Sequence, residues 1–313
     1  MKEINVKGMI PAAVLPMTAD YQPDYKAYAR YIEWLIAEGA VAIAVNMDTG
    51  EGPSLTQEER RRAVATCAEV AGGRCAVLAG VMGATTQNAV EMAKMYREAG
   101  ADGVVVFPNA AFRNEPLDPR IPYSYHKAIA DEAGLPIVLF QLAPVFGGVN
   151  YTRETLLRLL EIPQVIAVKE ASFDARYFAY TKETLDMAGR PIVLLTGNDR
   201  FITESFLLGA EGALLGFGAV GCRMVAEMLN CFARGDYKAG VAMRPRVQGF
   251  ANFIYKDPIL DYRARCKAAL AHLGILDRGQ IFVRPPLFPV SDEEYEEIGE
   301  ALVQAGMLEK RPA

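Results

Sequence analysis

Short runs of consecutive apolar residues alternate with longer amphipathic stretches from the N-terminus to about residue 220. The short runs are rich in β-branched residues, a composition that favours strands buried on both faces of a sheet. The pattern predicts eight strands: Gly8–Ala13, Ala40–Asn46, Cys75–Val81, Gly103–Phe107, Ile137–Gln141, Val165–Lys169, Ile192–Thr196 and Ala213–Gly216.

The stretches between these runs show helical spacing. In residues 87–99, for example, Ala89, Met92, Ala93 and Tyr96 recur at intervals of three and four, which places them on one face of a helix. Residue types that favour the N-cap precede this segment, and a glycine follows it. Strands and helices therefore alternate along most of the chain.

This alternation predicts an α/β fold, a (β/α)8 TIM barrel, in which the parallel strands close on themselves. An open doubly wound sheet is the alternative, but residues 10–16 lack the glycine-rich phosphate loop that usually follows its first strand. The sequence thus predicts a barrel over residues 1–220, which carries the active site, and a C-terminal helical region over residues 221–313. The helices expected in that region span approximately Arg223–Arg234, Tyr237–Ile254, Ile259–Leu273 and Ser291–Ala305.

Composition and charge narrow the possible classes of protein. The chain is 51% hydrophobic and 23% charged, and its net charge of −5 gives no footprint for nucleic acid or an anionic membrane. No apolar run approaches the ~20 residues that span a bilayer. The first residues lack the apolar core of a signal peptide, so we expect a cytoplasmic protein. Five scattered cysteines without a CxxC pair indicate reduced, mostly buried thiols.

The two histidines limit the available chemistry. His126 and His272 lie on predicted helices without metal-ligand spacing, which argues against a zinc site. A Ser-His-Asp triad would need one of them as base, and the sequence contains no GxSxG elbow. A nucleotide-binding GxxxxGK[ST] loop is also missing. Lysine, carboxylates, threonine and tyrosine remain as candidate chemical groups.

Lys169 ends one of the predicted buried strands, directly after four apolar residues. An ammonium group at such a position loses hydration, and this loss lowers its pKa. A neutral amine can then attack a ketone and form a Schiff base. The alternative is a lysine that extends to solvent or pairs with a carboxylate.

Other candidate site residues follow the strands at their C-terminal ends, where TIM barrels have their active sites. Asp48 and Thr49 follow the second strand, and Gly197 follows the seventh. These residues are expected to converge with Lys169 at one mouth of the barrel.

Taken together, these segments resemble the dihydrodipicolinate synthase / N-acetylneuraminate lyase family of class I aldolases. The resemblance covers nearly the whole chain, and the order and spacing of its motifs make it specific. The matching segments are Leu15-Pro16-Met17 with Asp24, Thr49-Gly50-Glu51 with Leu55-Thr56 and Glu58-Glu59-Arg60, Ala79-Gly80-Val81, Ala99-Gly100-Ala101-Asp102-Gly103, Val168-Lys169-Glu170-Ala171-Ser172, Gly197-Asn198-Asp199 and Arg284-Pro285-Pro286-Leu287.

The resemblance implies that Lys169 forms an iminium with a 2-oxo acid such as pyruvate. It also implies that Thr49 and the Gly50 backbone bind the substrate carboxylate, and that Gly197 and the Leu214 carbonyl line the pocket. It implies no metal and no cofactor, which agrees with the scarcity of histidine. The expected assembly is a homotetramer built from two dimers.

Four departures from the family pattern stand out. Asp48 replaces the first of two adjacent hydroxyl residues, and Phe140, followed by Gln141, replaces the tyrosine that shuttles protons. We expect Phe140 and Gln141 to contribute to the substrate pocket, Phe140 as an apolar wall. The loop 143–148 lacks the arginine that holds a second carboxylate in many synthases, and residues 109–112 lack the usual aromatic pair.

Three explanations for the missing tyrosine remain open. Asp48 is one candidate for the general acid/base, although an aspartate before Thr49 and Gly50 also suits a simple turn. A nearby group such as Tyr255 or Glu170, or a bound water, is the second explanation. Retention of the lysine without turnover is the third.

The sequence therefore predicts a Schiff-base-forming lyase, an aldolase or a dehydratase, that acts on a 2-oxo acid and is not a standard dihydrodipicolinate synthase. The apolar loop after the fifth strand suggests a substrate whose distal end carries less charge. A non-catalytic 2-oxo-acid-binding protein is the rival interpretation, because a fold does not guarantee activity.

Overall fold

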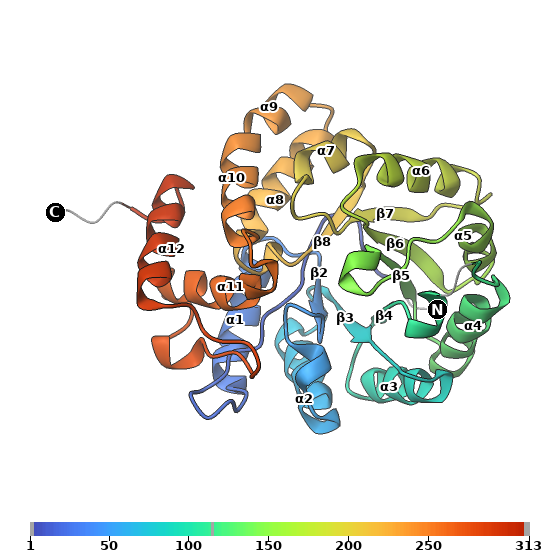
Figure 1. Cartoon of the computed structure of the whole chain (residues 1–313), viewed down its shortest axis with the longest axis horizontal. Helices are drawn as coiled ribbons and strands as arrows, with labels where there is room; N and C mark the ends of the chain where they lie inside the picture. The colour runs from blue at the N-terminus through green and yellow to red at the C-terminus, as the bar shows by residue number, and fades with distance from the viewer. Residues whose placement is uncertain (1–2, 114–115, 310–313) are drawn as a thin grey trace.

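A computed structural model of the chain describes residues 3–113 and 116–309. Eight parallel strands form one sheet in the order β1-β8-β7-β6-β5-β4-β3-β2. A parallel bridge between Ala12 and Ala44 brings the β1 and β2 edges together, so the sheet closes into a (β/α)8 TIM barrel (Figure 1). The strands are β1 (Met9–Pro11), β2 (Ala42–Val45), β3 (Ala76–Val81), β4 (Gly103–Val106), β5 (Ile137–Leu142), β6 (Val165–Ala171), β7 (Val193–Thr196) and β8 (Gly212–Leu215).

Helices connect consecutive strands and surround the barrel (Figure 1). Their starts follow the capping chemistry of the sequence; Thr56, for instance, forms a reciprocal capping box with Glu59. The barrel helices are α1 (Tyr25–Ala37), α2 (Gln57–Ala71), α3 (Thr86–Glu98), α4 (Arg120–Ala133), α5 (Arg153–Leu160), α6 (Ala175–Asp186), α7 (Ile202–Leu207) and α8 (Gly218–Ala233).

Two apolar clusters explain why the strands are continuous hydrophobic runs. One fills the space between the sheet and the helices, and the other fills the barrel interior, where Ile10, Leu78, Val105, Leu195 and Leu214 meet. Each strand is covered on both faces, so neither face carries the polar residues of a half-exposed strand. Four of the five cysteines are buried in this packing, as the sequence predicted.

The remaining helices form a group beside the barrel, drawn in orange and red in Figure 1. They are α9 (Tyr237–Ala242), α10 (Arg244–Ile254), α11 (Tyr262–His272) and α12 (Asp292–Gln304). The expected division at residue 220 falls inside α8, which begins at Gly218 and is kinked at Gly221. The two-part division stays a prediction, and its ends at residues 1–2 and 310–313 lie outside the described chain. No helix in the described ranges is long and apolar enough to cross a membrane.

A buried ion pair ties α11 to the loop after β2. The Lys267 Nζ atom lies 2.5 Å from Glu51 Oε1 and donates to the Phe282 carbonyl at 2.6 Å. The other Glu51 oxygen accepts the backbone N–H of Arg284 at 2.8 Å. Both side chains are almost fully buried, so each supplies the charge that the other needs away from water. This network fixes α11 over the mouth of the barrel.

Candidate active site

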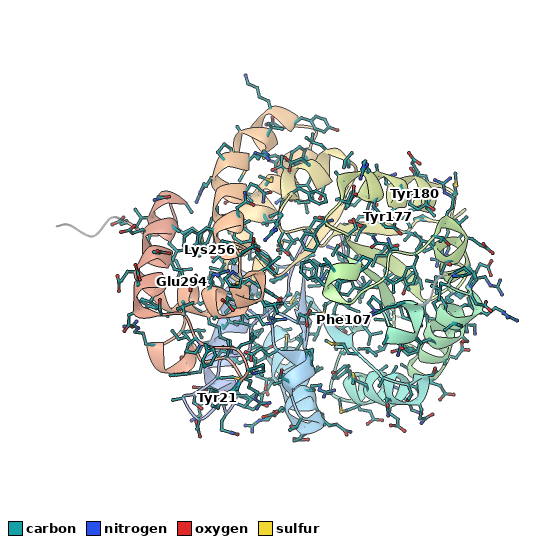
Figure 2. The ribbon with its side chains drawn as sticks, in the orientation of Figure 1. Tyr21, Phe107, Tyr177, Tyr180, Lys256 and Glu294 are labelled. Atoms are coloured by element: carbon teal, nitrogen blue, oxygen red, sulfur yellow. The ribbon has the colours of Figure 1, made fainter. Side chains whose placement is uncertain are left out.

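A cavity of about 490 Å³ opens at the C-terminal ends of the strands. Its walls come from the loop after β2, from β5 and β6, from the loops after β7 and β8, and from the segment that leads into α11. Phe107, which follows β4, also lines it and lies near the middle of the barrel in Figure 2. Asp48, Thr49, Phe140, Lys169 and Gly197 all border this one space, as the sequence predicted.

Lys169 reaches the cavity from β6 and is 8% exposed. Burial lowers the pKa of this amine to about 8, although the nearby charges of Asp199 and Asp48 act in the opposite direction. No described carboxylate forms an ion pair with the Nζ atom, which instead lies 4.0 Å from the centre of the Phe140 ring. The amine is thus partly neutral near physiological pH and faces open space.

Phe140 and Gly197 shape the surroundings of this amine. The Phe140 ring, which packs edge-on against Phe107 at 4.8 Å, forms an apolar wall without a proton to transfer. A β-carbon at Gly197 would lie 2.7 Å from Lys169 Cε and 2.9 Å from Ala171 Cβ. Only glycine therefore leaves room for the lysine side chain at this point.

Asp199 is a second buried ionisable group on the cavity, and it is 5% exposed. Burial raises the pKa of its carboxyl to about 6. This shift is opposed by the Phe217 N–H, which donates at 2.8 Å, by the charge of Lys169 and by a hydrogen-bonding interaction with the Tyr255 side chain. A carboxyl group with this pKa is suited to accept and return protons near neutral pH.

Two stacked tyrosines form the wall opposite the barrel strands. The rings of Tyr255 and Tyr262 lie 4.7 Å apart, and the Tyr262 hydroxyl is 3.4 Å from the Thr49 hydroxyl. A β-carbon at Gly216 would lie 2.0 Å from the Tyr255 hydroxyl, so the glycine after β8 admits this ring. The C-terminal region therefore completes the polar part of the site.

Asp48 lies at the edge of the cavity, with its side chain 46% exposed. Its carboxylate is 3.6 Å from the Arg263 guanidinium, and its backbone carbonyl accepts the Arg263 Nε–H at 2.7 Å. Both groups line the cavity. The aspartate is thus within the site but partly solvated and opposed by a positive charge.

Glu170 points away from the cavity because successive residues of a strand face opposite sides. Its carboxylate accepts the Ser172 N–H at 2.9 Å and the Asn198 side-chain amide at 2.7 Å. Burial raises the pKa of this carboxyl to about 7. Glu170 supports the turns after β6 and β7 and does not border the cavity.

Three residues expected to bind substrate do not line the cavity: Gly50, Gln141 and Leu214. The Gly50 N–H donates to the Met47 carbonyl at 3.1 Å, and the Leu214 side chain belongs to the apolar barrel interior. Gln141 follows the inward-facing Phe140 and so faces outward, where it donates to Thr181 and accepts the Tyr151 N–H, both at 3.1 Å. The Gln141 side chain thus joins β5 to the outer layer, away from the cavity (Tyr177 of that layer is labelled in Figure 2), and its role in substrate binding stays a prediction.

A family model described as the dihydrodipicolinate synthetase family matches residues 5–305 of the chain. The chain belongs to this family. A 4-hydroxy-tetrahydrodipicolinate synthase of Nitrobacter hamburgensis is 30% identical over 302 residues, which cover 96% of this chain and 97% of the relative. A synthase of the same name from Aromatoleum aromaticum is 31% identical over 304 residues, with 96% and 99% covered.

Solved structures show the same likeness. The chloride-inhibited dihydrodipicolinate synthase of Acinetobacter baumannii, complexed with pyruvate, superposes with a TM-score of 0.84 and 26% identity over 97% of this chain and all of that one. YagE of Escherichia coli K12, also in complex with pyruvate, gives a TM-score of 0.87 at 22% identity over 96% and 99% of the two chains, which supports the fold alone. The family match confirms the resemblance that the sequence motifs indicated.

Within this dihydrodipicolinate synthetase family member, sequence reasoning missed several residues of the site. Asp199 was part of a recognised motif but was not assigned a role. Tyr262 and Arg263 were expected only as part of a helix, and Tyr255 was only one candidate to replace the missing proton-transfer group. Asp199 carried a usable signal, because it follows a strand two residues after Gly197. Nothing local identifies the other three, since they reach the cavity through the packing of the C-terminal helices: Tyr255 follows α10, and Tyr262 and Arg263 begin α11.

Proposed function

We propose that the protein is a Schiff-base-forming lyase, an aldolase or a dehydratase, that acts on a 2-oxo acid. The observation that carries this proposal is Lys169: a buried amine with a pKa of about 8, without an ion-pair partner among the described carboxylates, which faces a cavity of about 490 Å³. The family's curated relatives are named as synthases that belong to this class of chemistry.

In the proposed mechanism, neutral Lys169 attacks the ketone carbon and the resulting carbinolamine loses water. The protonated imine then accepts the electron pair that is released when a bond at the adjacent carbon breaks, which gives an enamine. The enamine takes up a proton in an aldolase, or expels a hydroxyl group as water in a dehydratase, and water hydrolyses the resulting iminium to release the product and restore the lysine. The hydroxyl groups of Thr49 and Tyr262, 3.4 Å apart at the cavity wall, supply hydrogen bonds for the substrate carboxylate.

We assign the proton transfers of the bond-breaking step, and not those of imine formation, to Asp199, with Tyr255 as its hydrogen-bonding partner. Phe140 has no ionisable group, so a different residue must move protons at this position. Asp199 borders the cavity, interacts electrostatically with Lys169 and has a pKa of about 6. Asp48, the residue that the sequence suggested, is the second candidate, but it is partly solvated and faces Arg263. Geometry and burial therefore favour Asp199.

The test of this function is borohydride reduction in the presence of a panel of 2-oxo acids, followed by intact mass measurement and by assays of turnover. One reduced adduct per chain, located at Lys169, together with product formation is the expected result. An adduct without turnover of any panel member would favour the non-catalytic binding protein, an alternative that Phe140 supports because it removes a hydroxyl group. If the protein forms no adduct and shows no turnover, both the enzyme and the binding-protein interpretations are ruled out.

Two broader expectations stay predictions. We propose a homotetramer built from two dimers, as the family resemblance implies, which light scattering after size-exclusion chromatography would check. The cytoplasmic location would be checked by fractionation of the source cells.

A further inference from the structure

The outer part of the cavity is apolar and partly open to solvent. Val145 and Phe146, in the loop after β5, and Leu260, before α11, all line the cavity mouth. Their exposed fractions are 83%, 38% and 51%. Single exposed apolar residues are common, but a cluster that continues into a cavity marks a binding surface.

Phe173 adds a second, independent observation. Its backbone has a φ of 58°, the left-handed region that bulky residues rarely adopt. The conformation is held by the Phe173 N–H, which donates to Asn198 Oδ1 at 2.8 Å, and it brings the ring to 5.4 Å from Phe146. Unfavourable backbone conformations persist where the surrounding structure enforces them, often at ligand sites. Here the result is an aromatic pair at the mouth.

The charges of the cavity complete the argument. Of the described residues that line it, only Lys169 and Arg263 carry positive charge. The Arg263 Nε–H donates to the Asp48 carbonyl at 2.7 Å and Nη1–H to the Leu260 carbonyl at 3.1 Å, while Nη2 lies 3.6 Å from the Asp48 carboxylate. The charge of this arginine is balanced by Asp48, and no other described residue that lines the mouth is a cation. Arg113 approaches Gly147 in the loop after β5 but does not line the cavity.

We propose that this mouth is a subsite for an apolar, aryl or branched alkyl, substituent on the far end of the 2-oxo acid. The inference rests on the proposed function, because the keto end of the same molecule must reach Lys169. A ring in contact with Val145, Phe146 and Leu260 removes apolar surface of both partners from water, which favours binding. A carboxylate at the same place would lose its hydration without gaining a partner.

The test compares three 2-oxo acids: pyruvate, 2-oxo-4-phenylbutanoate and 2-oxoglutarate. The concentration that gives half-maximal reductive trapping of Lys169 is measured for each. We expect the phenyl compound to reach it at about tenfold to hundredfold lower concentration than 2-oxoglutarate, the range for burial of one aromatic group. Calorimetric titration of the Lys169→Met variant with the same acids gives the ranking without an imine, so a failure of Schiff-base chemistry is distinguishable from a failure of the subsite.

The variants Val145→Ser and Phe146→Ser should reduce the preference for the phenyl compound, because they raise its half-maximal concentration by a larger factor than that of pyruvate. Met187→Ser is the matched control, because Met187 is 57% exposed but does not line the cavity. Equal or tighter binding of 2-oxoglutarate would overturn the proposal. Variants that weaken the binding of all three acids by the same factor would also overturn it. So would variants that change the oligomeric state but not the ranking of the acids, since the apolar mouth would then be an interface between subunits.

Discussion

Two lysines of this chain are buried to a similar degree, and their surroundings differ. Lys267 is fully buried between α11 and the loop after β2, with Glu51 2.5 Å from its amine. Lys169 is 8% exposed, forms no ion pair with a described carboxylate and faces a cavity. Burial lowers the pKa of both amines. Burial alone therefore does not distinguish the two amines; the lack of an ion-pair partner among the described carboxylates and the open space are what support Lys169 as the proposed nucleophile.

The largest expected effect is the loss of the nucleophile. Lys169→Met should abolish reductive trapping by every 2-oxo acid, because the side chain keeps its approximate length and loses its amine. The protein should stay folded, since a buried amine without an ion-pair partner contributes little to stability. Intact mass after reduction, with circular dichroism as a control for folding, measures both. Undiminished trapping in this variant would contradict the assignment.

A second comparison separates the two carboxylates near Lys169. Asp199→Asn should slow turnover by about 10²- to 10⁴-fold, the usual contribution of general acid/base catalysis. Trapping at pH 7 should not become slower, because the Asp199 charge raises the pKa of Lys169 and its removal leaves a larger fraction of the amine neutral. Asp48→Asn should change turnover much less, since asparagine also suits the turn. A large loss in Asp48→Asn with a small one in Asp199→Asn would reverse the assignment.

Substitution of Lys267 should lower the stability of the protein, whereas substitution of Lys169 should not. Lys267→Met leaves the Glu51 carboxylate buried without its cation, which should lower the free energy of unfolding by roughly 3–5 kcal/mol. The matched double variant Lys267→Met with Glu51→Gln should recover part of this loss. Urea denaturation of the single and double variants measures the difference. A stable single variant would mean that the pair contributes nothing.

The smallest effect is a pH dependence. Lys169 must be neutral to attack a ketone, so the rate of imine formation should rise about tenfold per pH unit below its pKa and level off above about 8. Cyanoborohydride trapping by pyruvate between pH 6 and 9.5 follows this curve. A rise that continues toward pH 10 would mean that Lys169 behaves as an ordinary, solvated lysine, and the contrast with Lys267 would lose its basis.

Local sequence patterns predicted the eight strands, because each strand depends on residues close together in the chain. The shared position of Thr49, Lys169 and Gly197 then followed from the rule that the parallel strands of a barrel end at one mouth. The outward direction of Gln141 was also available from the sequence. Residues that alternate along a strand cannot both face the cavity, and Phe140 already does.

The wall formed by Tyr255, Tyr262 and Arg263 was not predictable in the same way. Tyr255 follows α10, and Tyr262 and Arg263 begin α11. They border the cavity because these helices pack beside the barrel mouth, and the position of α11 depends on contacts such as Lys267 with Glu51, more than 200 positions away. The charge balance around Asp48 depends on the same packing, since its partner Arg263 belongs to that helix.

The position of α11 also gives the site an order of assembly during synthesis. A nascent chain that has emerged as far as residue 233 contains all eight strands, Lys169 and Asp199, yet it lacks the tyrosine pair and the lysine that closes the Glu51 network. The ribosome therefore synthesises Lys169 well before the residues of the wall that covers it. Ribosome-bound intermediates should therefore capture 2-oxo acids poorly. Capture should become efficient only when the last fifth of the polypeptide has packed onto the mouth of the barrel.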